Sequence, residues 1–146
     1  MIKIGVMDYM TERILQELVT QTDIVTYFDI SQPLDILIAS RVFAYDHAFS
    51  QRIIIANSDD RDVLQCISPA KACIITYGLN PKAAITASSH IEDGKYVICV
   101  QRAMTTIGNM PVLPHEFTVK IKDCQGYDES ALGAIAAALI CGVNFD

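Results

Sequence analysis

Four short runs of apolar, mostly β-branched residues constrain this chain more than any other feature of the sequence. Continuous runs of this length, without strict alternation, are typical of strands that are covered on both faces. The runs are IKIGVM (2–7), DIVTYF (23–28), RIIIAN (52–57) and ACIITYG (72–78). These four runs therefore predict a parallel, Rossmann-like sheet in the N-terminal half of the chain.

Helices are expected between these strands. TERILQELVTQT places apolar residues at helical spacing, with Thr11 as the expected cap. NSDD (57–60) supplies caps for a helix over about 60–67, with Asn57, Ser58 and Asp59 as the capping side chains. Residues 29–51 fit either a short strand followed by a helix or a single helix, and we favour a helix from about Ala39 to Phe49.

The pattern changes after Ala83. AAITASSHI, KYVICVQRA and EFTVKIK alternate in part, and EDG (92–94) is a hairpin-turn signal between the first two. TTIGNMPVLPHE is rich in Gly and Pro, which predicts a loop or an interrupted edge strand. DESALGAIAAALICGV predicts a buried closing helix, with Asp128 as its cap and Gly142 near its end. The expected fold is therefore α/β: a partial, mostly parallel sheet with an antiparallel C-terminal extension and a closing helix, in one domain over 1–146.

Charge and cysteine content exclude several classes of function. A net charge of −6 disfavours the clustered Lys and Arg that nucleic-acid binding needs. The charged N-terminal residues fit neither a signal peptide nor a membrane span, so we expect a cytoplasmic protein without a membrane partner. The five cysteines are an odd number without C-x-x-C spacing, which favours free, mostly buried thiols over a disulfide or a zinc site.

From Arg52 onwards the chain carries, in this order, a strand ending in N-x-D-D, a short helix, ITYGL followed by A-x-I-x-A, a hairpin, and the helix ALGAIAAALICGV. This order of motifs resembles the ATP-binding central domain of Mur ligases. Upstream, GVMDYMTERILQEL and TDIVTYFDISQPLD fall where the family has its magnesium Glu and the following strand. The resemblance implies relatedness to enzymes that join amino acids or peptides to UDP-muramyl precursors of peptidoglycan, such as UDP-N-acetylmuramyl tripeptide synthetases.

The family's nucleotide-site residues are nevertheless altered in this chain. The phosphate-binding loop G-T-x-G-K-T/S has no counterpart, since the only Gly-Lys pair, Gly94-Lys95, belongs to the expected hairpin. The resemblance places Asp8 at the magnesium Glu and Pro33 at the magnesium His. It places Tyr127 and Ser130 at the two adenine-contacting Asn positions. On this basis Asp8 is a degenerate metal ligand, and Tyr127 and Ser130 are degenerate adenine contacts.

Other polar residues leave alternatives open. Asp59 and Asp60 fit magnesium or ribose ligands, but we favour the alternative in which Asn57, Ser58 and Asp59 cap the next helix. Asp8, Asp29 and Asp35 fit a residual cation site, although hard cations need several convergent oxygens. His90 and His115 fit a general acid or base, but we favour ordinary strand residues because no nucleophile or carboxylate accompanies them at a suitable spacing.

We therefore expect a non-catalytic Mur-ligase-like binding or interaction module. The alternative is one subunit of a split ATP-dependent ligase, whose partner chain supplies the phosphate loop and the end domains. We expect no cofactor; if the chain retains residual ligase activity, ATP and Mg²⁺ are the expected cofactors. A chain without the central phosphate-loop strand must also cover an interior sheet edge. Either the first strand takes the vacant position, or a second copy pairs there, and on this ground we expect a homodimer or a ligase partner.

Overall fold

The computed structural model describes residues 1–20, 23–46, 50–88 and 94–145. Eight strands form one sheet in the order β10-β7-β6-β5-β4-β3-β1-β2. The N-terminal part of this sheet is parallel throughout. Its strands are β1 (Ile2–Gly5), β2 (Ile24–Tyr27), β3 (Leu34–Ala39), β4 (Gln51–Asn57) and β5 (Cys73–Tyr77).

The C-terminal part of the sheet turns antiparallel. Its strands are β6 (Ile85–Ala87), β7 (Lys95–Val100) and β10 (His115–Lys120). β6 pairs in parallel with β5, whereas β7 runs antiparallel to both β6 and β10. The Gly- and Pro-rich segment forms a separate short hairpin of β8 (Met104–Thr105) and β9 (Pro111–Val112). The α/β fold with an antiparallel extension is confirmed.

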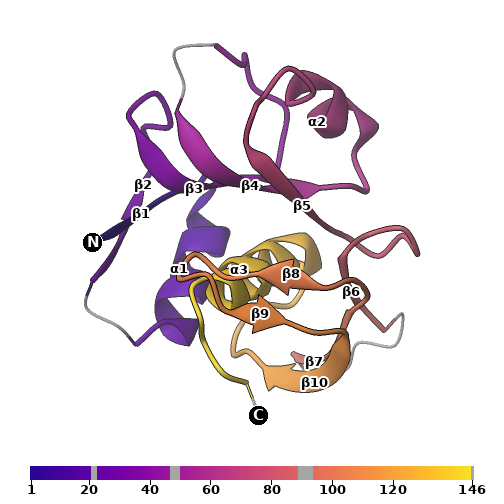
Figure 1. Cartoon of the computed structure of the whole chain (residues 1–146). Coiled ribbons are helices and arrows are strands. Elements are labelled where there is room, and N and C mark those ends of the chain that lie inside the picture. The colour runs from indigo at the N-terminus through magenta and orange to yellow at the C-terminus, as the bar shows by residue number, and fades with distance from the viewer. Residues whose placement is uncertain (21–22, 47–49, 89–93, 146) are drawn as a thin grey trace.

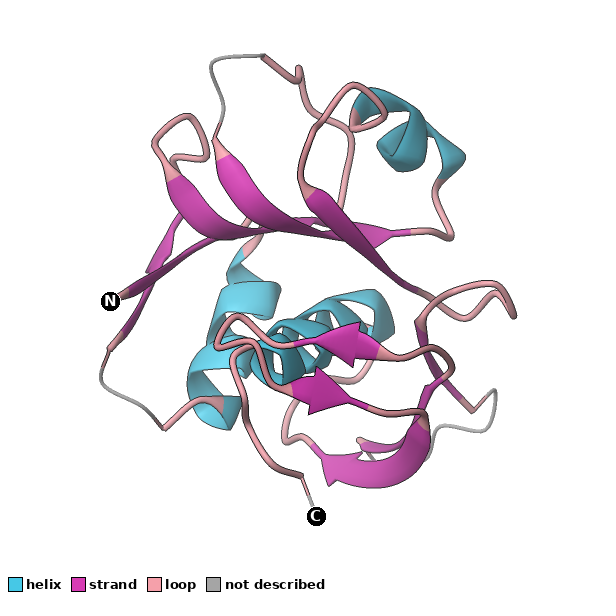
Figure 2. Cartoon of the chain, viewed as in Figure 1, coloured by secondary structure: helices cyan, strands magenta, loops and turns pink. Residues whose placement is uncertain are grey.

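The helices of the described chain lie on both faces of the parallel part of the sheet (Figures 1 and 2). Helices α1 (Tyr9–Leu18) and α3 (Asp128–Ile140) share one hydrophobic core with the strands, and α2 (Arg61–Cys66) packs in a second core on the other face. The strands bend so that α3 lies between the parallel part and β7–β10, with the β8–β9 hairpin across it. Residues 131–140 are consequently all buried, as expected for a helix that is apolar all round.

The first strand occupies an interior position. β1 lies between β2 and β3, so the sheet is continuous from one edge to the other. The described strands thus leave no interior edge open for a second copy to cover. A homodimer therefore needs a different physical basis from an exposed interior edge.

A six-residue crossover joins β2 to β3 without a helix. It passes over β1 at Gly5, where an added Cβ would lie 2.5 Å from Leu34 Cδ1 and 3.3 Å from Ile30 Cγ2. The missing side chain at Gly5 therefore gives this crossover room to pack on the sheet. The helix favoured from Ala39 to Phe49 is wrong for the described residues, because Ala39 ends β3 and residues 40–46 are irregular; residues 47–49 lie outside the described chain.

Two helix caps also differ from the sequence-based predictions. Asp8, not Thr11, caps α1, because its carboxylate accepts from the Thr11 backbone N–H at 2.8 Å. Tyr127, not Asp128, is the capping residue of α3, and it makes no side-chain capping bond. Asp128 lies in the first turn, where it accepts from the Tyr96 hydroxyl at 2.8 Å.

The two aspartates of NSDD bind different partners, which the sequence pattern did not predict. Asp60 caps α2 by accepting from the Asp62 backbone N–H at 3.0 Å. Asp59, which was grouped with the capping residues, binds the loop after β5 instead. The hairpin turn predicted at 92–94 lies outside the described residues at 92–93, but the β6–β7 pairing that it implies is present.

Candidate functional site

The strand order places a topological switch point, which we call the crevice, at the carboxyl ends of β1 and β3. From β1 the chain runs through α1 to β2 on one side of this strand pair. From β3 it runs to β4 on the other side, so the two connections lead in opposite directions. Ligands of open α/β sheets bind at such switch points. The polar side chains that follow the strands are therefore the first candidates for a site.

Asp8 joins three elements at this crevice. Its carboxylate accepts from the Thr11 N–H and hydroxyl at 2.8 and 2.9 Å. It also accepts at 3.2 Å from the hydroxyls of Ser40, after β3, and Ser130, in the first turn of α3. The guanidinium of Arg41 donates to the Met7 carbonyl, which ties the end of β3 to the end of β1. Asp8 thus holds the starts of α1 and α3 against the sheet.

Asp59 forms a second set of bonds at the ends of β4 and β5. Its carboxylate accepts from the Leu79 and Asn80 backbone N–H groups at 2.7 and 3.0 Å, and from the Asn80 side-chain amide at 2.7 Å. Burial alone raises the pKa of Asp59, but these hydrogen bonds outweigh it and lower the pKa below its ordinary value. The loop approaches closely because residue 78 is glycine, where an added Cβ would lie 2.6 Å from the Asp59 carboxylate.

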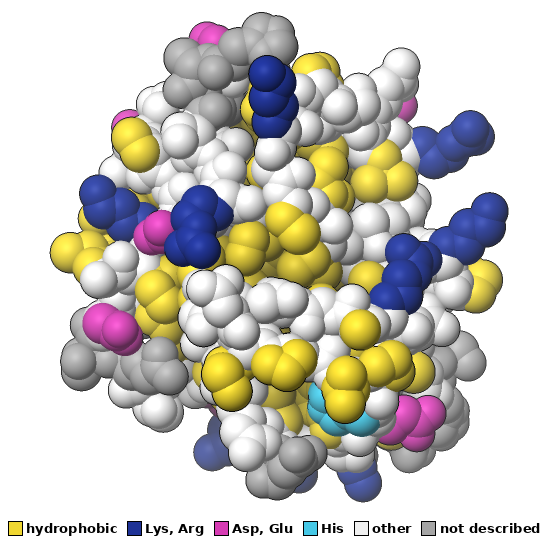
Figure 3. All heavy atoms as spheres, in the orientation of Figure 1, with side chains coloured by type: hydrophobic (Ala, Val, Ile, Leu, Met, Phe, Trp, Pro, Cys, Tyr) yellow, Lys and Arg dark blue, Asp and Glu magenta, His cyan; other side chains and the backbone are white. Residues whose placement is uncertain are grey.

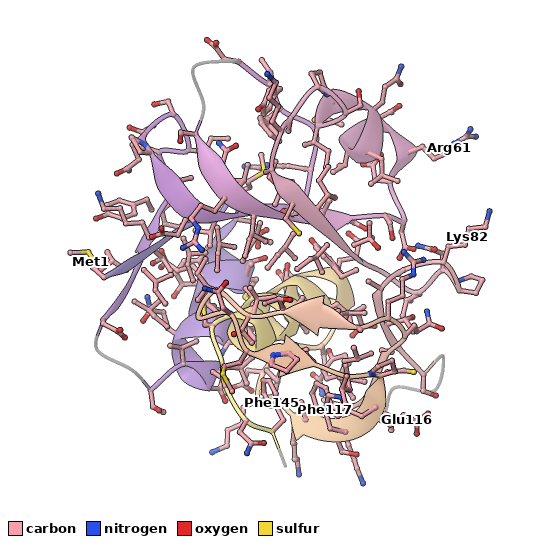
Figure 4. All side chains as sticks on the ribbon, viewed as in Figure 1. Met1, Arg61, Lys82, Glu116, Phe117 and Phe145 are labelled. Carbon is pink, nitrogen blue, oxygen red and sulfur yellow. The ribbon has the colours of Figure 1, made fainter. Side chains whose placement is uncertain are left out.

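A hollow of about 660 Å³ opens beside Asp59 and beside Ser40, which is hydrogen-bonded to Asp8, and we call it the polar pocket. It is lined by Ser40, Arg41, Asn57, Asp59, Asp60, Arg61, Asp62 and Glu129. Four of these residues carry carboxylates and two carry guanidinium groups. Arg61 projects outward (Figure 4), and carboxylates outnumber guanidinium groups among the lining residues.

Tyr77, at the end of β5, is 1% exposed. Its hydroxyl has no hydrogen-bond partner among the described residues. The ring packs against Gly133 of α3, where an added Cβ would lie 3.0 Å from the phenol oxygen. Burial, together with the charges of Asp8, Glu129 and Asp59, raises the pKa of Tyr77 far above its ordinary value.

The structure brings together two of the three residues predicted from the resemblance. Asp8 and Ser130, which are 122 positions apart, are hydrogen-bonded. Tyr127 lies one turn away at the start of α3, with 49% of its surface exposed. Pro33 immediately precedes β3 and so lies at the opposite end of the parallel strands from Asp8. The roles in metal and adenine binding remain predictions.

The remaining acidic candidates do not gather with Asp8. Asp29 binds Ser31 in its own turn, and Asp35 accepts from the Lys3 N–H near the start of β3. Within the described ranges, no three His, Cys, Asp or Glu residues are arranged to hold a metal ion. Ser40 and Arg41 were missed from the sequence because residues 34–39 were not assigned firmly to a strand.

The other candidate side chains lie away from the crevice. His115 begins β10 and stacks on Phe117 at 5.2 Å, whereas His90 lies outside the described residues. All five cysteines are free; Cys124 and Cys141 are buried, and Cys73 is exposed. None of the helices in the described chain combines the length and apolar composition that a bilayer span requires.

A second hollow of about 680 Å³ lies between the β8–β9 hairpin, β10 and the C-terminal residues. Exposed Met110 and Leu113 and the half-buried Phe145 contribute to it. Hydrophobic side chains gather on this face beside His115, drawn in cyan in Figure 3. The two hollows thus differ in character, one polar and one largely apolar.

Comparison with known proteins gives no family for this chain. The sequence matches no known protein-family profile, and no curated protein is significantly similar to it. The relationship to Mur ligases therefore stays a prediction that rests on the order and spacing of the sequence motifs.

Proposed function

We propose that this chain is a non-catalytic binding module related to the central domain of Mur ligases. In this proposal the polar pocket takes a small ligand that carries an amino group. The observation that carries the proposal is the state of the two carboxylates at the crevice. Asp8 accepts four hydrogen bonds from the chain itself and Asp59 accepts three. Both carboxylates are therefore already used in hydrogen bonds that hold the surrounding loops and helix starts. This favours a structural role for Asp8 and Asp59 in a binding site over a catalytic role.

The charge of the polar pocket supports the choice of ligand. Its four carboxylates outnumber its two guanidinium groups, and Arg61 extends into solvent. A triphosphate would meet net repulsion here, whereas an ammonium group would be attracted. Glu129 is exposed and makes no hydrogen bond that involves its carboxylate among those found in the described chain, so it is available to a ligand. Because of the resemblance to Mur ligases, peptidoglycan-precursor metabolism is the first setting to examine.

Isothermal titration calorimetry tests this proposal. The probes are amino acids and short peptides with free amino groups, N-acetylated forms of the same compounds, and ATP with Mg²⁺. We expect saturable binding of the free amines and no binding of the acetylated forms. Glu129→Gln should weaken the binding, and the matched change Glu17→Gln, on the exposed surface of α1, should not. Equal binding of the acetylated forms would overturn the choice of ligand.

ATP distinguishes the proposal from its alternatives. Saturable binding of ATP and Mg²⁺ by this chain alone would contradict a non-catalytic module. Ligase activity that appears only when a chain with a G-T-x-G-K-T loop is added would instead support the split-ligase alternative.

A further inference from the structure

Strand β10 forms one edge of the eight-stranded sheet, and among the described residues it pairs with β7 alone. The Ile121 N–H donates to the Gly94 carbonyl at 2.8 Å, which fixes the alternation of the antiparallel ladder. Backbone groups of Val119 and Phe117 therefore point toward β7. Those of Glu116, Thr118 and Lys120 point to the open edge, and in the described part of the chain no bond to them is found.

The two faces of β10 differ sharply. Phe117 and Val119 are buried, and the Phe117 ring stacks on Phe145 at 4.9 Å. Glu116 points away from these two rings, as Figure 4 shows. Glu116, Thr118 and Lys120 are all exposed. The strand therefore presents an open row of backbone donors and acceptors together with an outer face of charged and hydroxyl side chains.

The charges on this face are not balanced within the chain. Lys120 lies directly opposite Lys95 of β7, and like charges in that position repel each other. Glu116 lies opposite Cys99. Neither Glu116 nor Lys120 takes part in an ion pair among the described residues. An acidic group placed beside Lys120 would relieve the repulsion from Lys95.

We propose that a second copy of this chain supplies that group by pairing β10 with β10 in antiparallel orientation. With Thr118 on the two-fold axis, Glu116 lies opposite the partner's Lys120, and Lys120 lies opposite the partner's Glu116. Both pairs fall on the same outer face. The dimer thus forms two cross-strand ion pairs and extends the sheet across both copies.

The backbone agrees with this register independently of the charges. Glu116, Thr118 and Lys120 carry the outward backbone groups, so each pair in the register is a hydrogen-bonded pair, with about six bonds across the interface. A register centred on Phe117 would bring Lys120 opposite Pro114, which has no N–H to donate. The other edge strand, β2, has the sequence IVTY and no charged side chain that would select a register.

Sedimentation equilibrium of the full chain, over the concentration range that its solubility allows, tests the dimer. Glu116→Lys and Lys120→Glu should each weaken association about tenfold, because attraction is replaced by repulsion in both ion pairs. The double swap E116K/K120E should restore association to near that of the parent, since the pairs re-form with reversed sign. A monomer at every concentration, or a dimer that is unchanged by either single variant, would overturn the proposal.

Cysteine cross-linking tests the register. Thr118→Cys places two thiols opposite each other at a Cα separation of about 5.5 Å, which suits a disulfide. Mild oxidation should convert this variant to a covalent dimer. Lys120→Cys, whose counterpart is the partner's Glu116 and whose neighbour on β7 is Lys95, should cross-link no more than the parent chain with its own exposed Cys73. Efficient cross-linking of Lys120→Cys would show that the register is wrong.

Discussion

Replacing Tyr77 with Phe should stabilise the protein. The Tyr77 hydroxyl is buried without a hydrogen-bond partner in the described chain, and its ring is 1% exposed. A buried polar group without a partner costs about 1–3 kcal/mol of desolvation. Phe keeps the ring and its contacts with Gly133 and removes only the oxygen, so the void that it leaves is small. The expected net gain in the free energy of unfolding is about 1 kcal/mol.

Urea denaturation measures this gain directly. The midpoint should rise while the slope m stays unchanged, because the surface exposed on unfolding is the same. The thermal midpoint should rise by about 3 °C for a chain of this length. A loss of about 1 kcal/mol or more would refute the reasoning, since it would show that the hydroxyl is satisfied in the folded protein.

Tyr96 provides a matched control, because its ring is also 1% exposed. Its hydroxyl donates to the Asp128 carboxylate at 2.8 Å and lies 3.3 Å from Cys124 Sγ. Tyr96→Phe removes the same atom but breaks a hydrogen bond to a charged group. It should therefore destabilise the protein by about 1–2 kcal/mol, opposite in sign to the Tyr77 variant.

Three further perturbations follow from the same contacts. The pKa of Asp59 is lowered in the folded state, so its stabilising effect is present above its unfolded pKa of about 4 and is lost as the pH falls through the folded value. Because Asp59 is exposed and solvent screens its interactions, Asp59→Asn should lower the free energy of unfolding by about 1 kcal/mol or less at pH 7, with the difference from the parent shrinking in acid urea titrations. Gly94→Ala should cost about 3 kcal/mol in the same assay, because φ is +72° and the new Cβ would lie 2.2 Å from the Ile121 carbonyl; an unchanged midpoint would contradict this. Burial raises the pKa of Cys141 to about 12, so mass spectrometry after alkylation of the folded protein near pH 8 should find exposed Cys73 modified and Cys141 intact.

The strands that the sequence predicted well are those with continuous apolar runs. β1, β2, β4 and β5 lie where the runs 2–7, 23–28, 52–57 and 72–78 placed them. β3 was uncertain because PLDILIASRVF fits strand and helical spacing about equally. Its neighbours β1 and β4 decide the matter, since they supply partners for its backbone groups on both sides.

The candidate site was predictable only in part. Asp8 and Ser130 were singled out by a resemblance, but nothing in their spacing indicated that they are hydrogen-bonded to each other. Asp59 and Asp60 are adjacent in sequence, and yet one binds the loop after β5 and the other caps α2. The partner that each carboxylate binds depends on which N–H groups the neighbouring strands bring within reach. The local sequence pattern does not contain that information.

The sequence by itself determined most of the strands and the class of fold, because apolar periodicity and turn residues act over a few positions along the chain. The tertiary structure alone decided that β1 fills the interior of the sheet and that Asp8 joins three separate elements. It also decided that Lys120 faces Lys95 at an open edge. These features depend on strand order and register, which arise from contacts between residues far apart in the chain.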